Sequence, residues 1–224
     1  MDLWYSVANQ VSTLLTAEAA GNRTDIRAVR VPAASDSDTA TAQTVRMMAD
    51  YINKCVADPQ VIAAADYAWK RFALGRPEPA MKCWGVFWWV KHCIRFRLDE
   101  ATMFRIGEKD QQDLLMAPDV LLRMKDPAED CDGFTMLEAS MLQVLGIPVV
   151  IATVAVSPAD PSRWSHVFPC AILPGQVLPL DASNGPGPGW MVPRERIFRW
   201  QAWDLSGKRV KVEPMSYRGL HAVR

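Results

Sequence analysis

The stretch 132–156 constrains the fold more than any other part of the chain, because a helix and a buried strand meet there at a sharp boundary. Apolar side chains recur at helical spacing on one face, at Phe134, Leu137, Met141, Leu142 and Leu145. Gly146 is typical of a helix end, and Pro148 prevents the helix from resuming. Residues 148–156 are apolar and rich in β-branched side chains, as a buried strand requires. The pattern therefore predicts a helix over 132–145 followed directly by a strand.

Two further strands are predicted after a loop at 157–165 that contains two prolines. They cover 166–173 and 177–180, and Pro174-Gly175-Gln176 between them suits a tight turn. Strands joined by such a turn are antiparallel neighbours. Because helices precede the sheet in the chain, we predict an α+β fold with N-terminal helices and a central helix packed on an antiparallel β-sheet.

Several helices are predicted before this core. Apolar residues recur at spacings of three and four over 45–55. Asp58-Pro59 suits an N-cap followed by a proline at the first position of a helix that reaches Phe72. Residues 79–96 are so apolar that their helix should be nearly surrounded by protein. A short helix is also expected at 117–124.

The length of 224 residues suits one main domain with an appendage. We expect residues 1–43 to form an N-terminal extension that is partly helical or mobile, with a short helix near 7–18. Residues 44–205 should form the main domain, and 206–224 a basic C-terminal tail. Half of all residues are hydrophobic, which is enough apolar surface to exclude wholesale disorder.

Charge and cysteine content narrow the class of protein. The formal net charge is zero, which removes the general attraction on which non-specific nucleic-acid binding depends. The densest apolar stretch, 83–90, is too short to cross a bilayer, and the first residues lack a secretory-signal pattern. Five cysteines without C-x-x-C spacing favour neither a disulfide framework nor a zinc site. We expect a cytoplasmic protein with free thiols, with no metal or cofactor, and with no nucleic-acid or membrane partner.

Cys131 is the strongest candidate for a nucleophile, because it stands at the start of the predicted central helix. Unpaired backbone N–H groups and the helix dipole favour a negative charge there, and the thiolate is the form that attacks a carbonyl carbon. Asp130 and Asp132 oppose ionisation of the thiol unless they point away. We expect both to cap the helix instead.

His166 and Asp181 are the candidates for a base and for the carboxylate that orients it. His166 opens one strand and Asp181 ends the next, so the tight turn between the strands should bring the two residues together. A Cys-His-Asp relay lets the imidazole take the thiol proton and return it to the leaving amine. A structural histidine and a turn aspartate are the alternative interpretation.

The other cysteines are weaker candidates. Cys55 and Cys83 lie on apolar helical faces and Cys170 lies in mid-strand, so all three should be buried. His92 and Cys93 are adjacent on a helix, where side chains diverge by about 100°, so they should not form a dyad.

Three blocks of sequence, in order, resemble the transglutaminase-like superfamily. Residues 130–134, Asp-Cys-Asp-Gly-Phe, and 145–149, Leu-Gly-Ile-Pro-Val, are similar to the D-C-D-D-F to L-G-I-P-V run of that family. Residues 165–168 and Leu180-Asp181 resemble its S-H-V and L-D-P-T blocks. The Pro-x-x-Leu-Leu stretch at 118–122 resembles one seen in phage and prophage members. The resemblance covers roughly residues 44–200.

The resemblance implies a papain-like fold with Cys131, His166 and Asp181 as a catalytic triad. It also implies an oxyanion hole that uses the Cys131 backbone N–H, for which Gln111 or Gln112 is the candidate side chain. Gly133 stands where the family has a second acid, and Ala182-Ser183 stands where it has Pro-Thr. A different geometry on the substrate side is therefore expected.

We predict a cysteine-dependent amide hydrolase, either a peptidase or an isopeptidase, that acts on a peptide or protein substrate through an acyl-enzyme. Attack by an amine instead of water would make it a protein-glutamine acyl transferase, which cross-links proteins. The alternative from another class is a catalytically silent, phage-type assembly protein, associated with a phage or virion. Such a protein would bind its partner through the C-terminal region, where Trp190, Trp200 and Trp203 look exposed.

Overall fold

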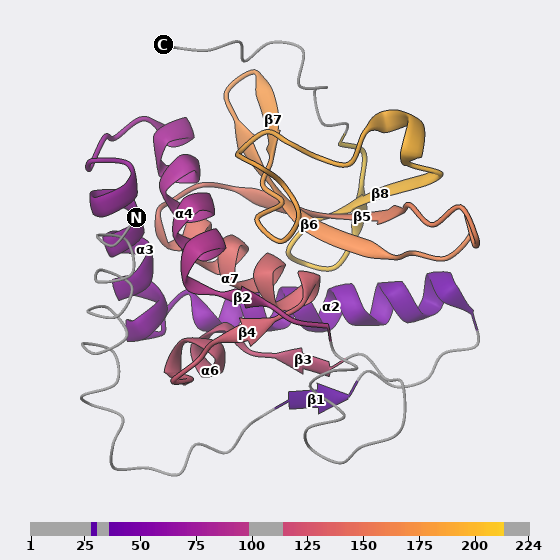
Figure 1. Cartoon of the computed structure of the whole chain (residues 1–224), viewed down its shortest axis with the longest axis horizontal. Helices are drawn as coiled ribbons and strands as arrows, with labels where there is room; N and C mark the ends of the chain where they lie inside the picture. Colours follow the sequence, from indigo (N-terminus) through magenta and orange to yellow (C-terminus); the bar gives the residue numbers. More distant parts are fainter. Residues whose placement is uncertain (1–27, 31–35, 99–113, 213–224) are drawn as a thin grey trace.

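The computed structural model describes residues 28–30, 36–98 and 114–212. In these ranges the protein is of the mixed α+β class, as predicted, with a layer of helices packed against one face of an antiparallel sheet (Figure 1). The predicted helix at 7–18 lies outside the described residues. None of the helices in the described ranges is long and apolar enough to span a bilayer.

The sheet has five strands in the order β7-β6-β5-β8-β9, and all neighbours are antiparallel. The strands are β5 (Val149–Ala155), β6 (His166–Leu173), β7 (Gln176–Pro179), β8 (Arg199–Trp203) and β9 (Arg209–Val210). The first three were predicted. In the register, His166 is opposite Val154, so the histidine lies at the end of β5 that is farther from the central helix's C-terminus. The strands β8 and β9 were not predicted.

The central helix α7 (Cys131–Val144) is surrounded by other elements. It contacts three helices, α2 (Ser37–Cys55), α3 (Pro59–Phe72) and α4 (Pro79–Cys93), as well as β6. The Asp130 side chain accepts a hydrogen bond from the Asp132 N–H at 2.9 Å and caps the helix. Gly146 follows the helix with φ of 75°, a conformation that favours glycine. The predicted boundary between helix and strand is therefore confirmed.

Two predicted boundaries fall inside regular structure. The helix α2 begins at Ser37 and is capped by Asp36, so the extension predicted to end at residue 43 runs into a helix. The strand β9 pairs with β8 inside the segment that was predicted to be a tail. Residues 35–39 are rich in Ser and Asp, which are common in loops, but an aspartate that caps a helix gives the same local pattern.

The remaining elements are short. They are β1 (Ala28–Arg30), β2 (Arg95–Phe96), β3 (Leu114–Met116), α6 (Pro118–Arg123), β4 (Ala128–Glu129) and the 3-10 turn η1 (Arg194–Arg196). The pair β2 and β4 is parallel and leads directly into Cys131. It thereby joins the end of α4 to the start of α7.

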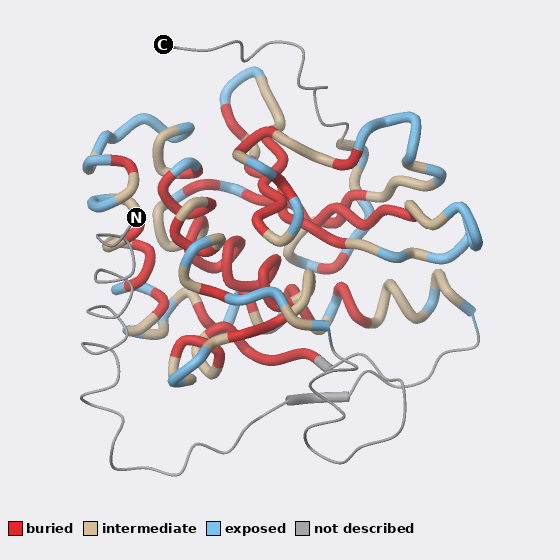
Figure 2. Tube along the Cα trace, in the orientation of Figure 1, coloured by how far each residue is buried: buried red, intermediate tan, exposed pale blue. Residues whose placement is uncertain are grey.

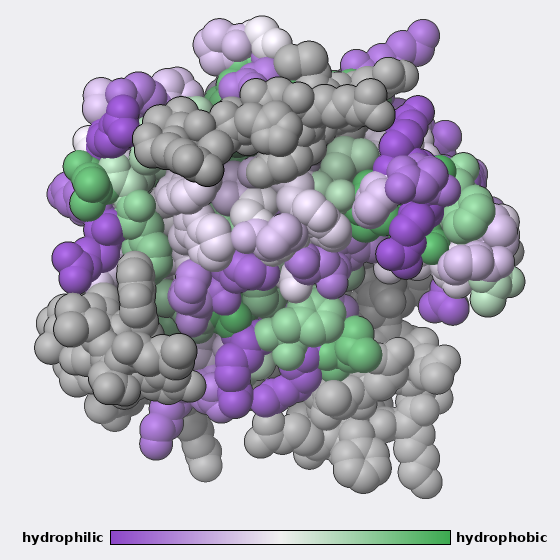
Figure 3. Space-filling model, turned by 45° about the horizontal axis from the view of Figure 1, so that its top comes forward, coloured by the Kyte–Doolittle hydropathy of each residue, from purple (hydrophilic) through white to green (hydrophobic). Residues whose placement is uncertain are grey.

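Each face of the sheet has its own apolar core. Most of α7 and of the inner strands is buried, as the tube in Figure 2 shows. The larger core lies between the helices and one face, and its sheet residues include Ile151 and Val167. The smaller core lies on the opposite face and includes Val154 and Phe168. On the face shown in Figure 3, hydrophobic residues are exposed only as small groups among polar ones.

The C-terminal tryptophans do not form the exposed patch that was predicted. Trp203 is 2% exposed, and its Nε1–H donates to Thr153 Oγ1 at 3.0 Å. Trp200 is half-buried, with its Nε1–H donating to the Val212 carbonyl oxygen. Trp190 is half-buried too and lines the cavity described below. Trp203 and Trp200 belong to strand β8 and pack against neighbouring residues. Because strand β8 was not predicted, the burial of these side chains was not predicted either.

Candidate active site

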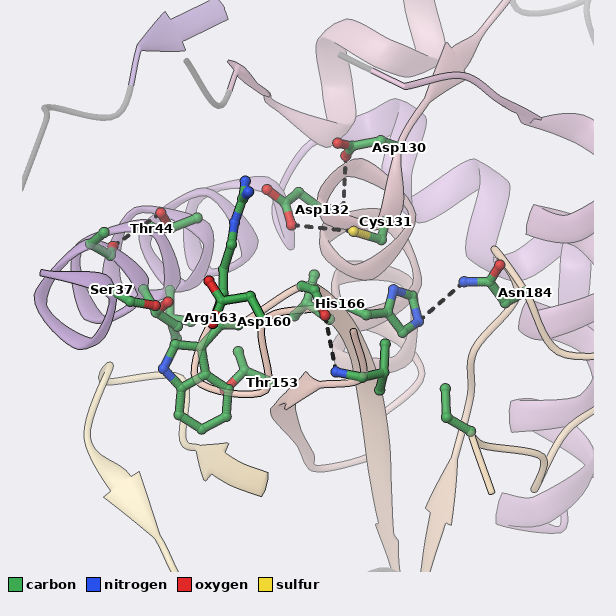
Figure 4. A pocket seen from close by; sticks show the side chains of 18 of the residues that line it. Ser37, Thr44, Asp130, Cys131, Asp132, Thr153, Asp160, Arg163, His166 and Asn184 are labelled. Atoms are coloured by element: carbon green, nitrogen blue, oxygen red, sulfur yellow. Dashed lines mark hydrogen bonds between the residues drawn. The ribbon is translucent and has the colours of Figure 1, made fainter. Parts of the chain in front are cut away.

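One cavity of about 900 Å³ brings the candidate nucleophile and base together. Its lining includes Cys131, at the first residue of α7, and His166, at the first residue of β6 (Figure 4). One wall is the N-terminal half of α2, and another is the loop before β6. The helical layer therefore contributes the thiol, and the sheet contributes the imidazole.

The thiol of Cys131 is held close to the start of β6. The backbone N–H of Val167, the residue after His166, lies close enough to lower the thiol pKa. The thiol itself donates a hydrogen bond to Asp132 Oδ1 at 3.8 Å. Asp130 caps α7, as predicted, but Asp132 turns toward the sulfur instead of away from it.

The pKa of Cys131 is raised well above its usual value of 9.0, not lowered as its helix position suggested. Burial is the largest cause, and the negative charges of Asp132, Asp130 and Asp181 add to it. The Val167 N–H acts in the opposite direction and is outweighed. The resting form at neutral pH is therefore the thiol, because the helix start does not compensate for burial and three nearby carboxylates.

The predicted contact between His166 and Asp181 is present. His166 Nε2 lies 2.8 Å from Asp181 Oδ2, and the two side chains are only 7% and 0% exposed. The Leu180 N–H donates to the Pro169 carbonyl oxygen, which extends the pairing of β6 and β7 as far as Asp181. With Nε2 occupied by Asp181, the nitrogen left for Cys131 is Nδ1, which lies on the side of the ring toward the thiol in Figure 4.

Asp181 is fixed by the turn that follows it. Its Oδ1 accepts hydrogen bonds from the Ser183 hydroxyl at 2.8 Å and from the Asn184 N–H at 3.0 Å. The Asn184 amide nitrogen also lies 3.3 Å from His166 Nε2. Sequence reasoning missed Asn184, although an Asp with a Ser and an Asn two and three residues later is typical of a turn closed by its own side chain.

Packing against Glu129 explains why a glycine stands at position 133, where the transglutaminase-like family has an acid. A Cβ atom at this position would lie 2.4 Å from Cγ of Glu129, which is closer than real Cβ atoms approach. Glu129 is 4% exposed and its Oε2 accepts a hydrogen bond from the Asp130 N–H. The buried Glu129 side chain thus occupies the space of a side chain at 133.

The predicted oxyanion hole stays a prediction. Gln111 and Gln112 lie outside the described residues. The Cys131 N–H belongs to the first turn of α7, where backbone donors have no partner within the helix. This backbone group remains the donor that we expect at the site.

The other cysteines behave as predicted. Cys55, Cys83 and Cys170 are buried. Burial raises the pKa of Cys55, Cys83 and Cys93 to about 12. His92 Nδ1 interacts with the Trp88 carbonyl oxygen at 2.7 Å, and the ring does not serve Cys93.

The ligand atoms of Asp130, Cys131 and Asp132 lie within 4.8 Å of one another, a spacing that could hold a cation. No further His, Cys, Asp or Glu among the described residues joins this group. Asp130 is engaged as a helix cap, and acidic groups commonly cluster without an ion. We therefore assign no metal to it.

Asp38, Trp164 and Arg199 form a clamp beside the cavity, and Trp164 is also part of the cavity lining. Asp38, in the first turn of α2, accepts hydrogen bonds from Trp164 Nε1 at 2.8 Å and from Arg199 at 2.8 and 2.9 Å. The Arg199 guanidinium also stacks on the Trp164 ring at 4.3 Å. These contacts join α2, the loop before β6 and strand β8.

Comparisons with known proteins assign no family to this chain. No family model matches the chain, and neither does any curated protein. Among solved structures, the chain is similar to the crystal structure of a "putative protease" from Parabacteroides distasonis, with 15% sequence identity and a TM-score of 0.44. The alignment covers 77% of this chain but only 31% of the other. A similarity of this strength bears on neither fold nor function.

Proposed function

We propose that this chain is a cysteine-dependent amide hydrolase, a peptidase or isopeptidase, with a papain-like core of the transglutaminase-like type. The observation that carries the proposal is the contact between His166 Nε2 and Asp181, 2.8 Å long, which leaves Nδ1 for the thiol of Cys131 in the same cavity. A Cys-His-Asp relay needs an imidazole with a carboxylate on one nitrogen and its other nitrogen in the cavity that the thiol lines. The sequence resemblance supports the same three residues.

Proton transfer in the proposed mechanism accompanies the attack, because the thiol is not ionised at rest. The carboxylate of Asp181 accepts a hydrogen bond from the Nε2–H of His166 and so keeps the lone pair on Nδ1. Nδ1 takes the thiol proton as sulfur bonds to the amide carbon, and the Cys131 N–H stabilises the oxyanion. The imidazolium then gives that proton to the leaving amine, and a thioester remains.

Water completes the reaction when His166 removes one of its protons and the resulting hydroxide attacks the thioester. The carboxylic acid departs, and the sulfur recovers its proton from the imidazolium. An amine in place of water would give the acyl transferase instead, because both reactions share every step as far as the thioester.

A second candidate function is favoured by the raised pKa of Cys131. A thiol surrounded by carboxylates suits a protein of this fold that binds a partner without turnover. The phage-type assembly role, and the cytoplasmic or virion location, remain predictions that belong to this candidate as much as to the enzyme.

The decisive measurement is the pH dependence of Cys131 alkylation by iodoacetamide, followed on the Cys131 peptide by mass spectrometry. We expect His166→Ala to slow alkylation at pH 7 by roughly tenfold or more, since the base contributes factors of about this size. His92→Ala is the matched control and should have no effect. A thiol that reacts only above about pH 9 in both wild type and His166→Ala would sink the enzyme proposal.

Turnover is tested separately with a mixture of peptides and a fluorescent primary amine. New peptide carboxyl ends indicate hydrolysis, and incorporation of the amine into protein indicates acyl transfer. Both must disappear in Cys131→Ala. Alkylation that depends on His166 without either product would favour the silent, partner-binding candidate.

A further inference from the structure

Glu138 is an anomaly in the core. It lies on α7 seven residues after Cys131, which is two turns along the helix. The residue is 0% exposed, and neither carboxyl oxygen has a hydrogen bond of normal geometry in the described part of the chain. Fully buried acidic side chains are rare without a partner, because removing a charge from water is costly.

The surroundings of Glu138 point to Asp181 and the residue that follows it. The backbone N–H of Ala182 lies near enough to the Glu138 carboxyl to lower its pKa, although it makes no normal hydrogen bond. The carbonyl oxygen of the same residue accepts a hydrogen bond from Lys91 Nζ at 3.1 Å. Glu138 of α7 and Lys91 of α4 therefore act on the two sides of one residue, Ala182.

The surroundings of Glu138 favour its protonated form. Burial, followed by the negative charge of Asp181, raises its pKa well above 4.5, and the Ala182 N–H and Lys91 only partly oppose this. Two buried thiols, Cys83 of α4 and Cys170 of β6, also lie near Glu138. Burial raises the pKa of each, and a negative charge on Glu138 would raise it further, so both thiols are protonated. A neutral acid can still accept the Ala182 N–H, and it adds no second negative charge behind the His166–Asp181 pair.

We propose that Glu138 is a positioning residue of this site, whose buried carboxyl group holds the Asp181–Ala182 backbone against α7. The inference rests on the proposed function, because it gives a role to the support of Asp181. Helix α7 then carries the thiol at its first residue and the support of the orienting carboxylate two turns later. One rigid element thereby fixes the nucleophile relative to the sheet residues that serve it.

If Glu138 had no role at the site, an apolar side chain would suit its place in the core better. A methionine of similar length would fill the same space without an unsatisfied polar group, and such replacements are often neutral or stabilising. A buried acid that is kept at a cost in stability is expected where alignment of a site depends on it.

The test compares three variants of the full chain. Glu138→Met removes both oxygens and keeps the volume, and Glu138→Gln keeps a neutral acceptor for the Ala182 N–H. Ser140→Ala is the matched control, since Ser140 is also buried on α7 but bonds within the helix to the Met136 carbonyl oxygen. Three quantities are measured: the melting temperature, the rate of Cys131 alkylation by iodoacetamide at pH 7, and the ¹⁵N NMR signals of the His166 ring.

We expect Glu138→Met to melt at or above the wild-type temperature and yet to slow alkylation by roughly tenfold, because small misplacements of a working group have effects of this size. Its His166 signals should show loss of the single tautomer that Asp181 selects. Glu138→Gln and Ser140→Ala should stay within about twofold of wild type.

Three results would overturn the inference. The first is a Glu138→Met protein with wild-type alkylation and wild-type His166 signals. The second is a Glu138→Gln protein that loses as much reactivity as Glu138→Met, which would mean that the charge is needed. The third is an unfolded Glu138→Met protein, which would make the carboxyl group a requirement of folding.

The ring signals separate this inference from the proposed function. If wild-type alkylation does not depend on His166, the enzyme proposal fails. The NMR comparison still decides whether Glu138 sets the tautomer through Asp181, because it needs no substrate and no turnover.

Discussion

Asp132 opposes ionisation of the Cys131 thiol in two ways, because it is both a hydrogen-bond acceptor for Cys131 and a nearby negative charge. Each effect stabilises the protonated sulfur. Asp132 therefore disfavours the thiolate of Cys131. The reaction that we propose depends on His166 to remove the thiol proton. A chain without that base would carry an inert thiol.

Replacing Asp132 by asparagine removes the charge and keeps the size of the side chain. We expect Asp132→Asn to lower the pKa of Cys131 and to raise the rate of iodoacetamide alkylation at pH 7 several-fold. The control is Asp50→Asn, which removes an exposed carboxylate on α2 that is paired with Lys54. Equal alkylation rates in Asp132→Asn and wild type would show that burial alone sets the pKa.

Glu138 also makes a prediction about stability and pH. The folded chain keeps the Glu138 proton above pH 4.5, whereas the unfolded chain releases it, so this group lowers the free energy of unfolding as pH rises. Glu138→Gln abolishes that loss. Urea unfolding should therefore show the variant gaining on wild type from about pH 4.5 upward, by at most about 1.4 kcal/mol per pH unit. A difference that is constant with pH would mean that Glu138 is ionised in the folded protein.

The residues that carry the proposal were readable from the sequence, whereas those that support them were not. Cys131, His166 and Asp181 stand at ends of elements, where turns and helix boundaries give local signals. Glu138 has no such signal, because a Glu on a helix normally faces water. It is buried because α7 has protein on every side, which is a property of the packing and not of the helix.

At the scale of elements, prediction succeeded where boundaries carry proline or glycine. The helices α3, α4 and α7 begin or end at such residues, and those boundaries were predicted to within about a residue. The far end of α4 has neither residue, and the helix predicted over 79–96 ends at Cys93, before strand β2. The short pairs of β2 with β4 and of β8 with β9 were not predicted, because each covers only two residues on one strand. The β2–β4 pair matters to the site, because it sets the direction in which the chain arrives at Cys131.

The clamp between α2, the loop before β6 and strand β8 predicts how that loop moves. Asp38→Asn removes the charge that Arg199 and Trp164 share, so the loop should leave its place more often. Trypsin should then cleave after Arg163 several-fold faster in the native protein. Asp50→Asn on the same helix is the control, and equal cleavage rates in the two variants would show that the clamp does not hold the loop.

At the scale of the whole molecule, the site exists only where two layers dock. The helical layer brings the thiol, and the sheet brings the imidazole and its carboxylate, so neither layer contains a working group of three. The core between the layers therefore sets how Cys131 lies relative to the sheet, whereas the core on the opposite face meets the site only beside His166, whose ring contacts Phe168. This distinction could not be drawn from the sequence, because both faces of β5 and β6 are apolar.

Two valines of the sheet test that distinction. Val167 is 5% exposed and packs in the core between the layers, whereas Val150 is 7% exposed and packs in the opposite core, at the end of β5 away from His166. Truncation to alanine should destabilise the protein to a similar extent in each case, by about 1–3 kcal/mol in urea unfolding. Only Val167→Ala should change the rate of Cys131 alkylation, because only that cavity lets the two layers shift beside the sulfur. If Val150→Ala changes the rate as much, alignment of the site depends on the stability of the sheet as a whole and not on how the layers dock.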